Sequence, residues 1–138
     1  FAGASVKNKC WSGKNFTTLV DQLSDLYPDY QHVILQGIRE DENFLEIYDP
    51  LSAKDNVALQ QTMNLNEVMQ FLSNSHLLIS NDTGIRNMAI AAHTPTVGIF
   101  LLIQPFKYWP REGGHDCVFD LESQPSVKDV YKSAIRMI

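Results

Sequence analysis

Residues 76–100, HLLISNDTGIRNMAIAAHTPTVGIF, decide the fold class of this chain. The first five, 76–80, are mostly apolar and bounded by polar residues, which is typical of a strand buried on both faces. The polar turn 81–84 leads into a mostly apolar helix over 85–92, and 96–100 predicts a second buried strand. Strand, turn, helix and strand form a βαβ unit, whose crossover is expected to be right-handed.

The turn before this helix carries the candidate chemistry. Asp82 or Thr83 can cap the helix with a side-chain oxygen, and the Thr83 and Gly84 amides would lie at the positive end of its dipole. Because Gly84 has no side chain to obstruct approach, the helix start suits an anionic ligand, above all a phosphate. A capped turn without a ligand is the alternative interpretation, since short motifs often match by chance.

Further strands and helices alternate along the chain. Strands are predicted at 32–36, 56–59 and 117–119, a short helix at 43–48, and longer helices after three N-caps: Asn15, Asn64 and Ser126. The last two caps are followed by Glu67 and Asp129 at the spacing of a capping box. Buried strands alternating with helices predict an α/β domain, a Rossmann-like parallel sheet with helices on both faces.

Ligands of such sheets bind beyond the carboxyl ends of the strands. The loops expected at that edge are 3–9, 37–42, 60–64, 81–84 and 101–107. They hold most of the polar residues that the predicted core does not explain. The sequence therefore predicts one ligand site where these loops converge.

Composition excludes several other classes of protein. The 138 residues suit one domain, and a net charge of −5 argues against a nucleic-acid partner. No apolar run approaches the ~20 residues of a membrane span, and no signal peptide is recognisable. Cys10 and Cys117 have no C-x-x-C spacing, so a reducing cytoplasm is expected and a zinc or dithiol site is not. No G-x-G-x-x-G follows a strand, which disfavours an NAD enzyme.

An ordered set of short motifs adds a family resemblance. The motifs are Gly3-Ala4-Ser5, Lys9-x-Trp11, Gly37 with acidic residues after it, Met63-x-Leu65, Asn81-Asp82-Thr83-Gly84, and Ala91-Ala92-x-x-Pro95-Thr96-Val97 to Phe100. Together they resemble the carboxyl-terminal domain of the heptosyltransferase family of bacterial glycosyltransferases, glycosyltransferase family 9. The resemblance implies the C-terminal half of a two-domain GT-B enzyme that transfers heptose from ADP-heptose to the lipopolysaccharide inner core with inversion. Residues 1–5 look like the end of a strand running into a loop, so we expect a fragment of such an enzyme.

The resemblance also implies roles for the loop residues. Ser5 and Lys9 would hold the donor diphosphate, Lys9 as a flexible point charge. The acidic ribose contact would fall at or near Asp41, with Glu40 and Glu42 as register alternatives. Met63 would lie against the nucleoside, where a polarisable thioether packs well, or it is only a core residue. Trp11 we interpret as a packing residue.

Asp82, Thr83 and Gly84 would meet the diphosphate and the sugar, with Asn87 beside them. Lys9 and Asp82 are the expected catalytic residues; a charged Asp82 would orient sugar hydroxyls or the turn, since it repels phosphate. No metal or other cofactor is expected, because Lys9 and the helix-start amides could stabilise the leaving diphosphate. The general base and the lipid-linked saccharide acceptor would belong to an amino-terminal domain. The full-length enzyme would be cytoplasmic or peripheral to the inner membrane.

Two features depart from the family pattern. Asn87 stands where the family usually has His, and Leu101-Leu102-Ile103 replaces a Gly-x-Thr. Arg86 could supply a replacement positive charge. The departures keep two alternatives open: a non-catalytic Rossmann-like nucleotide-binding or interaction module, and a GT-B transferase that uses another nucleotide-sugar.

Overall fold

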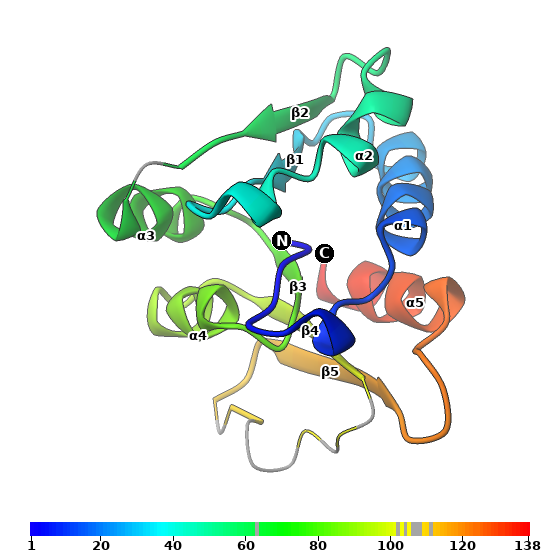
Figure 1. Cartoon of the computed structure of the whole chain (residues 1–138), viewed down its shortest axis with the longest axis vertical. Helices are drawn as coiled ribbons and strands as arrows, with labels where there is room; N and C mark the ends of the chain where they lie inside the picture. The colour runs from blue at the N-terminus through cyan, green and yellow to red at the C-terminus, as the bar shows by residue number, and fades with distance from the viewer. Residues whose placement is uncertain (63, 102, 104, 106–108, 111) are drawn as a thin grey trace.

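The computed structural model confirms a parallel α/β fold (Figure 1). It describes residues 1–62, 64–101, 103, 105, 109–110 and 112–138. Helices and strands alternate along most of the chain, as the sequence predicts. In chain order the structure has η1 Lys7–Lys9, α1 Gly13–Leu26, β1 His32–Leu35, η2 Glu40–Glu42, α2 Leu45–Tyr48, η3 Asp49–Leu51, β2 Val57–Gln60, α3 Leu65–Ser73, β3 Leu78–Asn81, α4 Gly84–Ala91, β4 Thr96–Leu101, β5 His115–Asp120 and α5 Val127–Met137.

The strands form two parallel sheets where the sequence predicts one. β1 pairs with β2, with His32 opposite Val57, and a second sheet has the order β3-β4-β5. In the second sheet α4 is the crossover between β3 and β4, so the predicted βαβ unit is present. Within each sheet, parallel strands bring their carboxyl ends to one edge. The loop after β1 and the end of β3 both approach Gly3: a Cβ built on Gly3 would lie 3.0 Å from Glu42 Oε1, and the Gly3 carbonyl accepts a hydrogen bond from Asn81.

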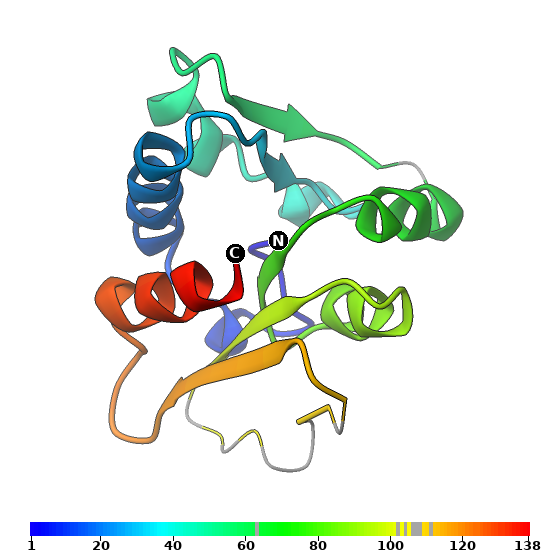
Figure 2. The ribbon, with the colours of Figure 1, turned by 180° about the vertical axis from the view of Figure 1, so that it is seen from behind.

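Helices cover the sheets from both sides. Figures 1 and 2 show α1 and α5 on one side of the strands and α3 and α4 on the other. α5 packs on β4 and β5, whereas α4 packs on β3 and β4. All six residues of β4 are buried as a result, which is the environment that its continuous apolar run predicts.

The structure confirms two of the three predicted helix N-caps and moves the third. The prediction that Asn15 caps the first long helix is wrong, because Ser12 takes that position and its side chain accepts a hydrogen bond from the Asn15 amide. Ser12 has extended backbone angles, so Gly13 already belongs to the first turn. Asn64 and Ser126 cap α3 and α5 as predicted.

Strand boundaries shift at the second sheet. β3 runs over Leu78–Asn81 rather than 76–80, and β5 is longer than the predicted 117–119 because His115–Asp120 pairs along the whole of β4. The first shift matters for the site, since it makes Asn81 the last residue of a buried strand.

Trp11 is a packing residue, as the sequence predicts. Its side chain is 1% exposed and its ring packs edge-on against Phe16. The indole Nε1 donates a hydrogen bond of 2.7 Å to the Pro125 carbonyl, so the polar end of the buried ring is satisfied. Trp11 therefore fixes the loop after residue 3 to the segment that leads into α5.

Asp116 joins β5 to α5. Its Oδ2 accepts hydrogen bonds from Ser133 Oγ at 2.5 Å and Arg136 Nη2 at 2.8 Å, and its Oδ1 accepts one from the Cys117 amide. Burial raises the pKa of this carboxyl, but the hydrogen bonds from Ser133, Arg136 and the Cys117 amide outweigh burial and hold it below the ordinary 3.8. The charged form is thus favoured by folding.

We expect Asp116→Asn to lower the free energy of unfolding at pH 7 by about 1–3 kcal/mol, because hydrogen bonds to a charged acceptor are lost. A depressed pKa contributes stability above the unfolded value, and this contribution disappears as the pH falls through the folded value. Urea unfolding of Asp116→Asn and the parent, at pH 7 and at steps below about pH 4, measures the difference in their free energies of unfolding. A difference between variant and parent that stays constant over this range would contradict the assignment.

Candidate functional site

Asn81 joins two loops that carry predicted ligand contacts. The side chain is fully buried, and its Oδ1 accepts a hydrogen bond of 3.0 Å from the Trp11 amide. Its Nδ2 donates to the carbonyls of Ala2 at 2.7 Å and Gly3 at 3.3 Å. The segment between Gly3 and Trp11 is therefore held at the turn between β3 and α4. Sequence reasoning treated Asn81 only as a turn residue; the signal available was its place directly after a buried strand.

The structure brings the two predicted catalytic residues together. Lys9 Nζ lies 3.6 Å from Asp82 Oδ2, with exposed side-chain fractions of 38% and 15%. Lys9 ends the short helix η1, and its amide donates to the Val6 carbonyl. An ion pair this exposed adds little stability, so its main consequence is positional: it holds the Lys9 ammonium beside the start of α4.

The amino terminus of α4 is open. Thr83 is its N-cap, and Thr83 Oγ1 accepts a hydrogen bond of 3.2 Å from the Arg86 amide; of the two capping residues considered, Thr83 is the one observed. Gly84 is exposed, and a Cβ built on it would meet nothing within 4 Å. Asn87 is exposed one turn later on the same side of the helix. The positive end of the helix dipole is thus accessible beside Lys9.

In the acidic loop after β1, Glu42 rather than Asp41 faces the first loop, which is the segment from Gly3 to Trp11. Asp41 is 66% exposed and forms an ion pair with Arg39 at 2.6 Å. Glu42 is half-buried, and its carboxylate occupies the space that a side chain on Gly37 or Gly3 would need. Because both glycines lack a side chain, the Glu42 carboxylate can lie between the loop after β1 and the loop that begins at Gly3.

The remaining predicted residues divide into three cases. Ser5 is exposed at the bend just before η1. Met63 lies outside the described residues. Leu101 is buried at the end of β4 and belongs to the hydrophobic core. Leu102 lies outside the described residues.

The hypothesis that Arg86 supplies a charge to the ligand is wrong. Arg86 is fully buried, with its guanidinium 5.2 Å from the Phe100 ring centroid and its Nη2 donating to Cys117 Sγ at 3.3 Å. Burial raises the pKa of the Cys117 thiol to about 11, so Arg86 faces a neutral group at pH 7. Gly98 makes room, since a Cβ there would lie 2.5 Å from Arg86 Nε. Arg86 therefore points into the interior, where Gly98 leaves space for it and Phe100 and Cys117 contact it.

Two features are absent from the part of the chain that the structure describes: a cluster of metal ligands and a membrane-spanning helix. No three His, Cys, Asp or Glu side chains in this part of the chain are grouped so that they could hold a metal ion. Among the helices of the same residues, none has the length and apolar character needed to cross a bilayer. Positive electrostatics at the rim, meaning residues 3–11 and 81–84, come from the Lys9 ammonium and from the partial positive charge of the amides at the start of α4.

Comparisons with known proteins show the family and the fold of this chain. The model of the family Glycosyltransferase family 9 (heptosyltransferase) matches residues 1–133. Among solved structures, E. coli heptosyltransferase WaaC with ADP aligns with a TM-score of 0.85 and 16% identity over 100% of this chain and 43% of that chain. E. coli ADP-heptose LPS heptosyltransferase II aligns with a TM-score of 0.83 and 17% sequence identity, over 99% of this chain and 44% of that chain. A family 9 glycosyltransferase from Veillonella parvula DSM 2008 aligns with a TM-score of 0.77 and 21% sequence identity, over 99% of this chain and 44% of that chain.

At these identities the solved structures show the fold, which is that of one part of a GT-B glycosyltransferase. The chain spans less than half the length of the solved proteins that it matches. No curated protein sequence matches it.

We expect Gly84→Ala to leave the fold intact and to weaken binding of inorganic pyrophosphate by about tenfold or more, or 1.4 kcal/mol. The added methyl enters open space, so the free energy of unfolding should change by less than about 1 kcal/mol. The same methyl would stand in front of the helix-start amides that an anion approaches. Calorimetric titration with pyrophosphate measures the loss.

Gly113→Ala is the matched control, because a Cβ on Gly113 also meets nothing within 4 Å. It should bind pyrophosphate like the parent chain. Equal affinity in both variants would show that the start of α4 is not an anion site.

Proposed function

Because this chain belongs to glycosyltransferase family 9, the heptosyltransferase family, we propose that it is the donor-binding domain of an inverting glycosyltransferase. The donor is ADP-heptose, and the acceptor is a lipid-linked saccharide of the lipopolysaccharide inner core. The observation that carries the proposal is the 3.6 Å approach of Lys9 to Asp82 at the open start of α4. The solved E. coli relatives that hold ADP or ADP-2-deoxy-2-fluoro heptose support a nucleotide donor.

In the proposed reaction an acceptor hydroxyl attacks the anomeric carbon of the donor sugar. The bond from that carbon to the diphosphate oxygen breaks, and negative charge develops on the leaving ADP. Lys9 and the amides of Thr83 and Gly84 are placed to stabilise this charge electrostatically. We propose that these groups make a metal unnecessary. Ser5, at the bend before η1, would add a hydroxyl donor to the diphosphate.

Asp82 has a different role in this proposal. Its carboxylate repels a phosphate but attracts Lys9, so it sets the position of the ammonium. Its remaining lone pairs can accept hydrogen bonds from sugar hydroxyls. Asn87, exposed on the same side of α4, can bind the diphosphate or the sugar as a neutral group. A neutral amide cannot act as a titratable acid or base.

Glu42 is the proposed ribose contact. A carboxylate can accept hydrogen bonds from both ribose hydroxyls, and Glu42 lies beside Gly3 and Gly37 at the rim. Asp41 is held by Arg39 instead. Met63, two residues before α3, remains the proposed nucleoside contact. The general base and acceptor site would come from an amino-terminal domain, in an enzyme of the cytoplasm or the inner surface of the inner membrane.

We expect Lys9→Ala to weaken ADP binding by about 10- to 100-fold, because a charge-assisted hydrogen bond contributes about 1.5–3 kcal/mol. Calorimetric titration of the 138-residue chain with ADP and with ADP-heptose measures the effect. Lys128→Ala, which removes an exposed lysine from α5, is the control and should bind like the parent. Equal heats for Lys9→Ala and the parent would end the proposal.

A second pair of variants tests which acid contacts the ribose. Glu42→Gln should weaken ADP binding by about tenfold, since one charged acceptor for two hydroxyls becomes neutral. Asp41→Asn should have little effect, because Asp41 is exposed and paired with Arg39. The same titration with 2′-deoxy-ADP should show a much smaller difference between parent and Glu42→Gln. A larger loss in Asp41→Asn would return the role to Asp41.

Another nucleotide-sugar is the second candidate donor. Asn87 favours a different sugar, since it lies near the start of α4, where the sugar would be bound, and the family resemblance expects His there. Titration with another ADP-sugar beside ADP-heptose tests the sugar, and competition of UDP and GDP against ADP tests the nucleotide.

A further inference from the structure

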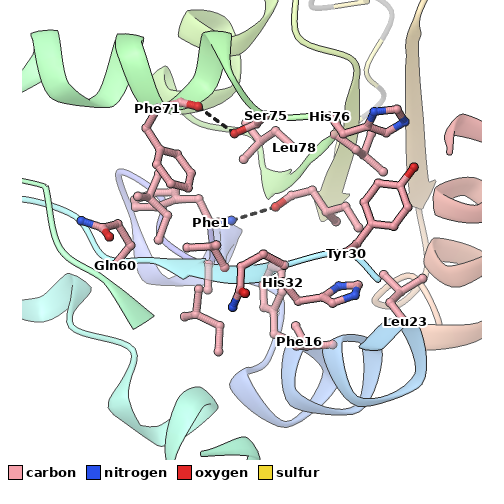
Figure 3. A pocket seen from close by; sticks show the side chains of 18 of the residues that line it. Phe1, Phe16, Leu23, Tyr30, His32, Gln60, Phe71, Ser75, His76 and Leu78 are labelled. Carbon is pink, nitrogen blue, oxygen red and sulfur yellow. Dashed lines mark hydrogen bonds between the residues drawn. The ribbon is translucent and has the colours of Figure 1, made fainter. Parts of the chain in front are cut away.

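Among the residues that the structure describes, only Arg86 has a charged side chain that is fully buried. The other buried polar side chains in this part of the chain are hydroxyls and one amide. Much of the interior is apolar, and between the two sheets lie Phe16, Leu23 and Leu78 (Figure 3). Taking a charge out of water costs free energy, so the place of this cation in the fold needs an explanation.

Arg86 lies in the first turn of α4, at the end of the helix where a cation is least favourable. Its amide donates to Thr83 Oγ1 at 3.2 Å, and it follows the open Gly84 by two positions. The positive end of a helix dipole repels a cation, and helical side chains lean toward the amino terminus. The guanidinium therefore lies on the interior side of the same amides that are open to an anion.

The surroundings of Arg86 keep its charge inside the protein. Gly98 leaves space for it, since a Cβ there would lie 2.5 Å from Arg86 Nε. The Phe100 ring, 5.2 Å away, offers its negative face to the cation. Nη2 donates to Cys117 Sγ at 3.3 Å. Because a guanidinium does not lose its proton in proteins, a full positive charge is fixed behind the start of α4.

Charges at the rim and in the interior act on the same buried thiol. Burial raises the pKa of Cys117 to about 11; the charge of Arg86 acts to lower this pKa, and the charge of Asp82 acts to raise it. Asp82 belongs to the rim, where it lies 3.6 Å from Lys9. Because Cys117 contacts Arg86, a rim charge that acts on the thiol also acts on the guanidinium. Protein rather than water lies between buried charges, so salt screens them weakly.

We propose that the buried charge of Arg86 strengthens the binding of the donor diphosphate at the start of α4 without touching it. This role rests on the proposed donor site. A fully buried guanidinium cannot contact the ligand, so it acts through its electric field alone. The bound anion in turn offsets the cost of burying the cation. Because the charge is fixed, the same field stabilises the leaving ADP with little reorganisation.

Two variants lower the charge of this interior region by one unit in different ways. Arg86→Met removes the positive charge, and Cys117→Asp adds a negative charge beside it. Cys117→Asn is the matched control for the second, because Asn has the shape of Asp without its charge. We expect Arg86→Met to bind pyrophosphate about tenfold more weakly than the parent, and Cys117→Asp about tenfold more weakly than Cys117→Asn. Calorimetric titration of the 138-residue chain measures these affinities.

Salt separates this effect from that of the exposed Lys9. Repeating the titrations at about tenfold higher salt should leave the losses in Arg86→Met and Cys117→Asp nearly unchanged. The loss in Lys9→Ala should shrink, because the Lys9 side chain is 38% exposed.

One measurement needs no substitution, so it does not depend on the folding of a variant. In the parent chain, the Nε–Hε NMR resonance of Arg86 should shift when pyrophosphate is added. The corresponding resonance of Arg136, which is exposed on α5, should stay in place.

Two results would overturn the role of Arg86. They are equal pyrophosphate affinity in Cys117→Asp and Cys117→Asn, and an Arg86 resonance that pyrophosphate does not move. A loss in Arg86→Met alone would indicate a structural role only and would overturn it too. If the parent does not bind pyrophosphate, the proposed donor site fails together with this inference. Binding by the parent with equal affinity in all variants removes only the role of Arg86.

Discussion

The buried amide of Asn81 is the constraint on which the ligand rim depends. A fully buried amide must have its hydrogen bonds satisfied inside the protein, and here its partners are the Trp11 amide and the carbonyls of Ala2 and Gly3. These partners belong to one loop, and Asn81 itself ends β3. The hydrogen bonds therefore fix the first loop, residues 3–11, against the β3–α4 turn. Every group proposed to meet a diphosphate lies on this loop, on this turn or, for Asn87, in the first turns of α4.

The rim combines two kinds of positive electrostatics. One is the ammonium of Lys9, which is mobile by nature and is held by Asp82. The other is the open start of α4, whose amides are fixed by the Thr83 cap and need no movement to meet an anion. A fixed dipole beside a positioned charge is the arrangement that stabilises a leaving group with little reorganisation. Glu42 brings a negative acceptor to the neighbouring loop, where a ribose rather than a phosphate can use it.

The two sheets and the rim are linked through residues 1–3. Ala2 and Gly3 accept hydrogen bonds from the Asn81 side chain, and the Phe1 nitrogen donates to the Ile79 carbonyl at 2.8 Å. Residues 1–3 are therefore held along the end of β3, next to the turn that leads into α4.

Much of this protein could be predicted from its sequence because the signals are local. The apolar run of β4, the polar turn before α4 and the caps of α3 and α5 each depend on a few neighbouring residues, and each is present in the structure. The motif set was likewise enough to indicate the family. Asn15 failed as a cap only because a competing residue, Ser12, lies three positions earlier.

Tertiary structure alone decided the rest, because burial and partners depend on distant segments. Its neighbours in sequence predict that Arg86 lies at the ligand site, but in the structure Arg86 is buried against Phe100 and Cys117. Asp41 and Glu42 are adjacent acids, and the structure distinguishes them: Asp41 is exposed and paired with Arg39, whereas Glu42 is half-buried beside Gly3 and Gly37. Asn81 looked like one more turn residue until its partners, 70 or more positions away, were in place.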